Sequence, residues 1–203
     1  MPIFGEDRSL RVNTQEDLAR LQALTPAEFR RYRYVSGHFT FSDVRQKCSA
    51  ESLLVSVLRD PVRRLVSEFN YVASWTGHPY HEHFKNARLS EHVYANAAYI
   101  RAVQCDWLSA HRNAEAAMQV IRERYALVGT VAGYDAFVAA LGRLIGQDVP
   151  ATRSNVTPGQ GLLDLDSRLC ETLLDLTLED RRLIARIAAL PDGVFAGEKV
   201  AAR

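Results

Sequence analysis

The stretch Ser52–Phe69, SLLVSVLRDPVRRLVSEF, decides the fold class of this chain. Its first part, Leu53–Leu58, is a continuous apolar run with the length and β-branched content of a strand that is buried on both faces, as in a parallel sheet. Asp60 and Pro61 have the residue types of a helix N-cap and a first helical position, and an amphipathic segment follows them. The stretch therefore predicts a strand that turns directly into a helix, with Arg59 at the turn.

Arg59 lies where the carboxyl end of a strand meets a helix N-terminus, the place where open α/β sheets bind ligands. Arg63 and Arg64 stand near the same end, where the helix dipole disfavours a cation by about 0.3–1 kcal/mol, and Asp60 offsets only one of these charges. A bound phosphate would relieve the repulsion, because backbone N–H groups and guanidinium groups both donate to its oxygens. The alternative is that Arg63 and Arg64 are solvated and that Arg59 pairs with Asp60.

The segment Arg59–Phe69, RDPVRRLVSEF, resembles the 3′-phosphate-binding motif of the carbohydrate sulfotransferases, in which Arg-Asp-Pro is followed by an Arg and then by a Ser. These enzymes transfer a sulfuryl group from 3′-phosphoadenosine-5′-phosphosulfate (PAPS) to a sugar hydroxyl and require no metal. The resemblance implies that Arg59 and Ser67 bind the 3′-phosphate of the nucleotide. Arg63 is a further candidate contact, because it adds positive charge at the same helix end.

Tyr34–Phe39, YVSGHF, is similar to a Gly-His-aromatic segment that these proteins carry upstream of the motif. In the heparan 2-O-sulfotransferase branch the His of that segment is the catalytic base, so the resemblance implies this role for His38. A neutral imidazole, with an unperturbed pKa of about 6.5, is suited to accept the proton of an attacking hydroxyl. The alternative is a His that caps the sheet edge through a backbone hydrogen bond.

The resemblance extends from about residue 30 to about residue 195. Its other parts are Asn96–Arg101, where Ala98 replaces the family's Gln, Tyr125–Thr130 and Leu178–Ile184. Arg153 lies in a Pro- and Gly-rich loop, and related enzymes bring a loop at this point of the chain over the nucleotide. Arg153 is therefore a candidate for a second phosphate contact, with an exposed loop arginine as the alternative.

One component of the family is missing from this sequence. Family members begin with a strand, a Pro-Lys-Thr-Gly-Gly-Thr-like loop and a helix that together hold the 5′-phosphosulfate, and the loop's Lys balances charge on the bridging oxygen. Here Lys47, Lys85 and Lys199 all lie outside any Gly-rich turn after an apolar strand. Met1–Gly5 reads like the family's second strand, so we expect an N-terminally truncated form of the P-loop-NTPase-like sulfotransferase fold.

The pattern as a whole predicts an α/β chain in which a small parallel sheet is surrounded by many helices, within a single domain spanning residues 1–203. A formal net charge of +1 argues against a general nucleic-acid or membrane-surface binder. No stretch approaches the roughly 18 apolar residues of a membrane span, and no signal peptide is recognisable. Three cysteines without a CxxC spacing fit a reducing compartment or incidental buried thiols, not a disulfide framework, and we expect a cytoplasmic protein.

The remaining elements follow from local signals. Thr14–Asp17 looks like a helix start, and Thr25–Glu28 has the residue types of a capping box. Strands are expected at about 34–36 and 126–129, and helices at about 90–110, 114–124, 165–176 and 178–190, with one more helix around Phe137. Thr177 is predicted to cap the last helix, the residues after the short apolar Pro2–Phe4 to form a polar loop that runs to Asn13, and residues 191–203 to fray.

His78–His83, HPYHEH, invites interpretation as a metal site. The segment lacks the HExxH spacing, and Pro79 prevents a regular helix there, so a solvated or acceptor-facing loop is favoured. The whole stretch Thr76–Ser90 is predicted to be irregular. Trp75, just before it, has two interpretations: a core aromatic at a helix end, or a ring that stacks on adenine or on a sugar.

Residues and resemblance together predict a PAPS-dependent O-sulfotransferase. His38 would deprotonate an acceptor hydroxyl, the oxygen would attack sulfur in line, and 3′,5′-bisphosphoadenosine would leave. The acceptor is expected to be a carbohydrate or another hydroxyl compound, without nucleic acid, metal ion or membrane span. Two alternatives stay open: a truncated, non-catalytic homologue that binds nucleotide or serves as an interaction module, and a metal hydrolase built on HPYHEH. The acceptor's identity and the oligomeric state also stay open.

Overall fold

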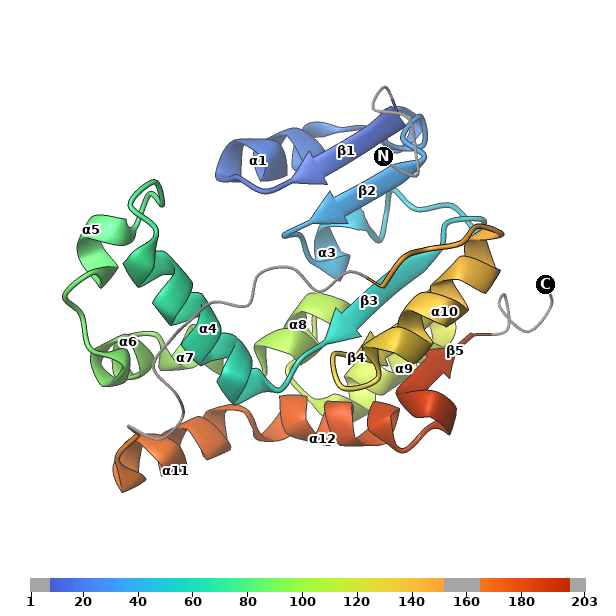
Figure 1. The fold of residues 1–203 in the computed structure, drawn as a ribbon. Coiled ribbons are helices and arrows are strands. Elements are labelled where there is room, and N and C mark those ends of the chain that lie inside the picture. The colour runs from blue at the N-terminus through green and yellow to red at the C-terminus, as the bar shows by residue number, and fades with distance from the viewer. Residues whose placement is uncertain (1–7, 152–164, 198–203) are drawn as a thin grey trace.

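The computed structural model describes residues 8–151 and 165–197, and within these ranges two small sheets lie among many helices (Figure 1). The predicted α/β class is confirmed. β1 (Ser9–Val12) and β2 (Tyr34–Gly37) form a parallel two-stranded sheet. β3 (Leu54–Leu58), β4 (Tyr125–Thr130) and β5 (Val194–Ala196) form a second sheet in the order β3-β4-β5, in which β5 runs antiparallel to β4.

The second sheet is centred on β4, whose residues are all buried because β3 and β5 flank it on either side. The prediction that Leu53–Leu58 forms a strand buried on both faces is wrong. Only Leu58 is buried in β3, and Val55 is 38 % exposed. The reason is the position of β3, which is an edge strand paired with β4 alone among the described residues.

Figure 1 shows β1, β2 and β3 pointing in the same direction, but no ladder joins β2 to β3 in the described part of the chain. The two sheets are instead linked by side chains. Leu54 of β3 packs against the cluster around Leu10, Val12 and Leu21, and also against the main core cluster that contains Val128.

The first residues differ from the prediction of a polar loop up to Asn13. Ser9–Val12 forms β1, in which Leu10 and Val12 are buried and alternate with more exposed residues. This is the period of a half-buried strand, but it is too short to stand out in the sequence.

Both predicted helix starts in the N-terminal region are confirmed. α1 (Gln15–Ala23) begins after Thr14, whose hydroxyl accepts the Asp17 N–H at 3.1 Å while the Asp17 carboxylate accepts the Thr14 N–H. α2 (Pro26–Phe29) begins after Thr25 with the same reciprocal bonds to Glu28. These capping boxes satisfy N–H groups that a helix start leaves unpaired.

The middle of the chain is helical. α3 (Phe41–Val44) precedes β3, and α4 (Pro61–Ser74) follows it. The stretch predicted to be helical at about 90–110 is divided into α6 (Leu89–Ala95), α7 (Ala97–Ile100) and α8 (Val103–Ser109), with a break at Ala102, whose φ is +51°. Thr76–Ser90 was predicted to be irregular, but it contains the short helix α5 (His81–Phe84), which begins two residues after Pro79.

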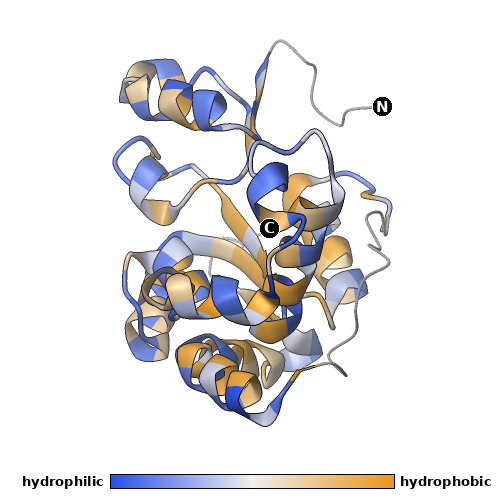
Figure 2. Ribbon diagram, turned by 90° about the vertical axis from the view of Figure 1, so that its left-hand side faces the viewer, coloured by the Kyte–Doolittle hydropathy of each residue, from blue (hydrophilic) through white to orange (hydrophobic). Residues whose placement is uncertain are grey.

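Helices cover both faces of the second sheet. α10 (Tyr134–Ile145) packs on one face through Phe137, Val138 and Leu144. α8, α9 (Ala114–Arg124) and α12 (Leu178–Ala188) contribute to the cluster on the other face. Figure 2 shows the resulting pattern, in which hydrophobic stretches alternate with hydrophilic ones along the surrounding helices.

The C-terminal part contains α11 (Ser167–Leu176) and α12, close to the predicted bounds. Thr177 was predicted to cap α12, but its side chain forms no capping hydrogen bond. Its hydroxyl donates to the Leu173 carbonyl instead. Residues 191–197 do not fray, because β5 pairs with β4. No helix within residues 8–151 and 165–197 combines the length and apolar character needed to cross a bilayer.

Candidate functional site

The strand–turn–helix predicted around Arg59 is present. Asp60 is the N-cap of α4, and its Oδ1 accepts the Arg63 N–H at 2.8 Å. Arg59 follows β3 and its side chain is exposed, with a guanidinium nitrogen donating to the Ser67 hydroxyl at 3.3 Å. The alternative pair between Arg59 and Asp60 is not found among the described residues, whose ion pairs lie elsewhere. The structure thus brings together the two side chains predicted to hold a phosphate.

The backbone of Arg59 is held by a residue that sequence reasoning missed. Gln104 on α8 accepts the Arg59 N–H through Oε1 at 3.1 Å and donates from Nε2 to the Arg59 carbonyl at 2.9 Å. Gln104 is buried, so these bonds are shielded from water. A glutamine amide within the buried run Ala102–Cys105 is the signal in the sequence that could have indicated such a contact.

Gln104 is in turn fixed by Asp180 of α12, which is fully buried. The Asp180 carboxylate accepts the Gln104 N–H at 3.2 Å and the Cys105 N–H at 2.8 Å, and so caps the start of α8. Burial raises the pKa of Asp180, while the two N–H donors oppose that rise. Burial, together with the nearby Asp180, also raises the pKa of Cys105, so this thiol stays protonated and inert.

The two other arginines at the site differ from one another. Arg64 is half-buried, pairs with Glu68 at 2.9 Å and lies over the Trp107 ring at 5.3 Å, so packing accounts for it. Arg63 is exposed, and no acidic side chain of the described residues forms an ion pair with it. The accessible positive charge at the start of α4 therefore comes from Arg59 and Arg63.

His38 lies at the carboxyl end of β2, on the same side as the carboxyl end of β3 (Figure 1). Its backbone N–H donates to the Val12 carbonyl at 2.7 Å, while its side chain is exposed. The main chain, not the imidazole, therefore closes this end of the ladder. Gly37 makes the close approach possible, because its φ is +127° and a Cβ there would overlap the Val12 carbonyl oxygen.

The described lysines are engaged away from Arg59. Lys47 Nζ donates to the carbonyls of Gln22 and Leu24, and Lys85 pairs with Glu82. The predicted contact Arg153, Lys199 and the strand-like Met1–Gly5 lie outside the described residues.

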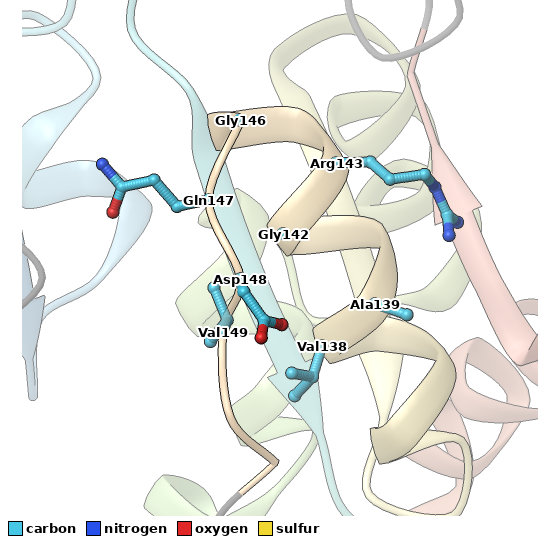
Figure 3. A pocket seen from close by; sticks show the side chains of 8 residues that line it. All are labelled: Val138, Ala139, Gly142, Arg143, Gly146, Gln147, Asp148 and Val149. Carbon is cyan, nitrogen blue, oxygen red and sulfur yellow. The ribbon is translucent and has the colours of Figure 1, made fainter.

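Cavities in the described part of the chain lie elsewhere than at these side chains. One is an open groove of about 520 Å³ between α10 and the segment that follows it, and another is about 340 Å³, near Cys48 and Glu123. In the first, Arg143 and Gln147 point to opposite sides and away from the groove (Figure 3). Neither cavity is lined by Arg59, Ser67 or His38.

The HPYHEH segment forms no metal cluster in the part of the chain that the structure describes. His78 Nδ1 accepts the Tyr80 N–H at 3.2 Å, and the His83 ring packs edge-on against Phe84. His92, to which the sequence assigns no role, lies half-buried between Phe69 and Phe84, and this burial lowers its pKa.

The arrangement at the end of β3 suits a small anion with several oxygens. It offers the Arg59 guanidinium, the Ser67 hydroxyl and the charge of Arg63 at the N-terminal end of α4. Comparison with protein-family models, with curated proteins and with solved structures gives no match for this chain.

Proposed function

We propose that this chain is a PAPS-dependent O-sulfotransferase that acts on a hydroxyl of a carbohydrate-type acceptor, built on a P-loop-NTPase-like sulfotransferase fold and acting in the cytoplasm without a metal ion. The observation that carries the proposal is the contact between Arg59 and Ser67 at the junction of β3 and α4. Both residues are those that the sulfotransferase resemblance assigns to the 3′-phosphate.

The phosphate would lie at the start of α4. The Arg59 guanidinium donates to its oxygens, and the Ser67 hydroxyl, which now accepts from Arg59, turns its own proton toward the anion. Arg63 adds charge from the first turn of the helix. Gln104 keeps the Arg59 backbone in place, so the guanidinium starts from a fixed point.

His38 is the proposed base. Its side chain is exposed, and it follows β2, whose carboxyl end lies on the same side as that of β3 although the two strands belong to different sheets (Figure 1). The imidazole takes the proton of the acceptor hydroxyl as its oxygen forms a bond to sulfur. The bond between sulfur and the bridging oxygen breaks, and 3′,5′-bisphosphoadenosine leaves with the bonding electron pair.

The first test is calorimetric titration with 3′,5′-bisphosphoadenosine. We expect wild type to bind, and Arg59→Ala to lose about 1.5–3 kcal/mol, or roughly ten- to a hundredfold in affinity, because a charge-assisted contact is removed. Arg122→Ala is the matched control, because Arg122 is an exposed arginine on α9, a helix that leads into the opposite end of β4. If folded wild type shows no binding at millimolar nucleotide, the proposal is wrong.

A second candidate function is a non-catalytic homologue that binds the nucleotide without transferring sulfate. The observation that favours it is that Lys47 and Lys85, the lysines within the described ranges, are bound elsewhere. Incubation with ³⁵S-labelled PAPS and a panel of glycans separates the two. Label in a glycan that disappears with His38→Ala supports the enzyme, whereas nucleotide binding without any transfer supports the homologue.

A further inference from the structure

The end of α4 and the turn after it carry four neighbouring rings, Tyr71, Trp75, His78 and Tyr80, here called the aromatic platform. Successive ring centroids are 5.4 Å apart for Tyr71 and Trp75, 5.6 Å for Trp75 and His78, and 5.8 Å for His78 and Tyr80. Tyr71, Trp75 and Tyr80 are 46 %, 47 % and 59 % exposed. Contiguous exposed apolar surface of this kind marks interaction sites in soluble proteins.

The platform is held rigid by its own backbone. The Trp75 N–H donates to the Tyr71 carbonyl at 3.0 Å, and the His78 N–H donates to the Trp75 carbonyl at 2.9 Å. The Tyr80 N–H donates to the His78 imidazole, which fixes that ring. Gly77 lies so close that a Cβ there would be 3.0 Å from Trp75 Nε1. Because the rings are ordered before any ligand arrives, binding costs little conformational entropy.

The exposed area of these rings is small compared with a protein–protein interface. A Tyr or Trp side chain covers about 150–250 Å², so three such rings at about half exposure offer on the order of 300 Å². A stable protein–protein interface needs about 800 Å² from each side. The rings alone therefore offer less than half of the area that a second copy or a folded partner needs, and they suit a small ligand. Successive rings are inclined to one another by 34°, 64° and 46°, so each presents its own face to such a ligand.

The side chains of the platform favour an uncharged ligand over an anion. His78 accepts a hydrogen bond at Nδ1 from the Tyr80 N–H, and the three other rings belong to Tyr and Trp side chains. After the platform, Lys85 at the end of α5 forms an ion pair with Glu82 at 2.6 Å. Within residues 8–151 and 165–197 the cation–ring contacts are made to Trp107, Phe41 and Tyr94, and none is made to a ring of the platform, so a phosphate or sulfate group is not the favoured ligand.

We propose that the aromatic platform binds the ring faces of an uncharged pyranose chain. The C–H bonds of a sugar face carry slight positive charge and lie well on the negative face of a Trp or Tyr ring, while sugar hydroxyls reach the indole N–H and phenol groups at the ring edges. Uncharged lipid tails would leave these polar edges unused.

The platform is remote from the proposed transfer centre. α4 has 14 residues, and at about 1.5 Å per residue it separates Trp75 from the Arg59 end by about 20 Å. A chain bound there is held several sugar units away from the reacting hydroxyl. This link to sulfate transfer rests on the proposed function, but the binding itself does not.

The test is titration with neutral hexasaccharides, namely cellohexaose, maltohexaose, chitohexaose and mannohexaose, followed by tryptophan emission. The chain has two tryptophans, so Trp107→Phe leaves Trp75 as the reporter. We expect a saturable change with at least one of these sugars. Tyr80→Ala should weaken it by about tenfold or more, as truncation of an exposed aromatic contact does. Tyr94→Ala, an exposed tyrosine on α6, is the matched control and should leave the affinity unchanged.

The absence of a saturable response at millimolar sugar would overturn the proposal. So would self-association in sedimentation velocity that Tyr80→Ala abolishes, because the platform would then serve a second copy. The outcome is independent of the nucleotide: Arg59→Ala should leave sugar binding intact, and Tyr80→Ala should leave bisphosphoadenosine binding intact. Failure of one proposal is therefore distinguishable from failure of the other.

Discussion

Gly37 lies at the carboxyl end of β2, against Val12, in a backbone conformation that residues with a Cβ rarely adopt. Its φ is +127°, and a Cβ would overlap the Val12 carbonyl oxygen, so we expect Gly37→Ala to lower the free energy of unfolding by about 1–3 kcal/mol or more. Gly146→Ala is the control, because Gly146 also has a positive φ, +67°, but no atom lies within 4 Å of its added Cβ. The loss of unfolding free energy in Gly146→Ala should stay at about 1 kcal/mol. Equal losses in urea denaturation would contradict this reasoning.

The Gln104 side chain holds the backbone of Arg59, so its loss should affect both stability and nucleotide binding. Gln104→Leu leaves the Arg59 N–H and carbonyl without their partner, so unfolding should become easier by about 1–3 kcal/mol. Nucleotide affinity should fall as well, because Arg59 loses its anchor. Gln119→Leu, at an exposed glutamine on α9, is the control for both measurements. If calorimetry gives Gln104→Leu the affinity of wild type, Gln104 has a structural role only.

These contacts show which part of the candidate site the sequence could predict. Arg59 and Ser67 are separated by eight residues on one strand–turn–helix, so local periodicity places them together. Gln104 and Asp180 reach their partners across separations of 45 and 76 residues. No local pattern encodes such a distance, and the long-range packing of α8 against α12 decides it.

At the scale of elements, helix starts were predictable where the cap is local. Thr14 and Thr25 bond to residues three positions on, and the sequence shows both partners. Thr177 carries the same pattern with Asp180, but the Asp180 carboxylate is engaged by the α8 amides, so the predicted cap is lost to a tertiary contact. β5 was missed for a similar reason, because its three residues form a strand only through pairing with β4.

The docking of α6 on α4 and α5 should depend on pH. The centroid of the His92 ring lies 5.8 Å from that of Phe69 and 4.8 Å from that of Phe84. Burial lowers the pKa of His92 below the unfolded value of about 6.5. As the pH falls through about 6.5, the unfolded chain takes up this proton before the folded chain does, so acid favours unfolding. Stability should therefore decline between about pH 7 and pH 5.

Urea denaturation at several pH values measures this dependence. His92→Gln should flatten the slope, because the variant has no proton to gain at that position. His111→Gln, at an exposed histidine, should keep the slope of wild type. A slope that survives in His92→Gln would assign the effect to other groups.

At the scale of the whole molecule, the sequence predicted one small parallel sheet, but the described residues form two. Apolar runs indicate strands, and Leu53–Leu58 has the composition of a central strand. Which strand takes the centre depends on pairing partners, and β4 is flanked on both sides while β3 is not. The composition of a strand does not encode its neighbours, so the number and order of the sheets could not be predicted.

This division predicts unequal opening of the two sheets. The β1–β2 sheet has a small cluster of its own, joined to the main core through Leu54 and through α3, which places Phe41 in one cluster and Val44 in the other. Amide exchange measured by mass spectrometry at rising urea should show β4 opening only with global unfolding. β1 and β2 should open at a lower free energy, because fewer buried contacts hold them.

Leu54→Ala tests the linkage directly. Its side chain is half-buried and contacts both clusters, so the substitution should lower the opening free energy of β1 and β2 by on the order of 1–2 kcal/mol, less than for a fully buried leucine. Leu53→Ala is the matched control, since Leu53 packs on the α10 side and not on the β1–β2 cluster. Leu53→Ala should weaken the protection of β4 while leaving the gap between the sheets in place. If β1 and β2 exchange at the same free energy as β4 in wild type, the two sheets unfold as one unit and the predicted unequal opening is wrong.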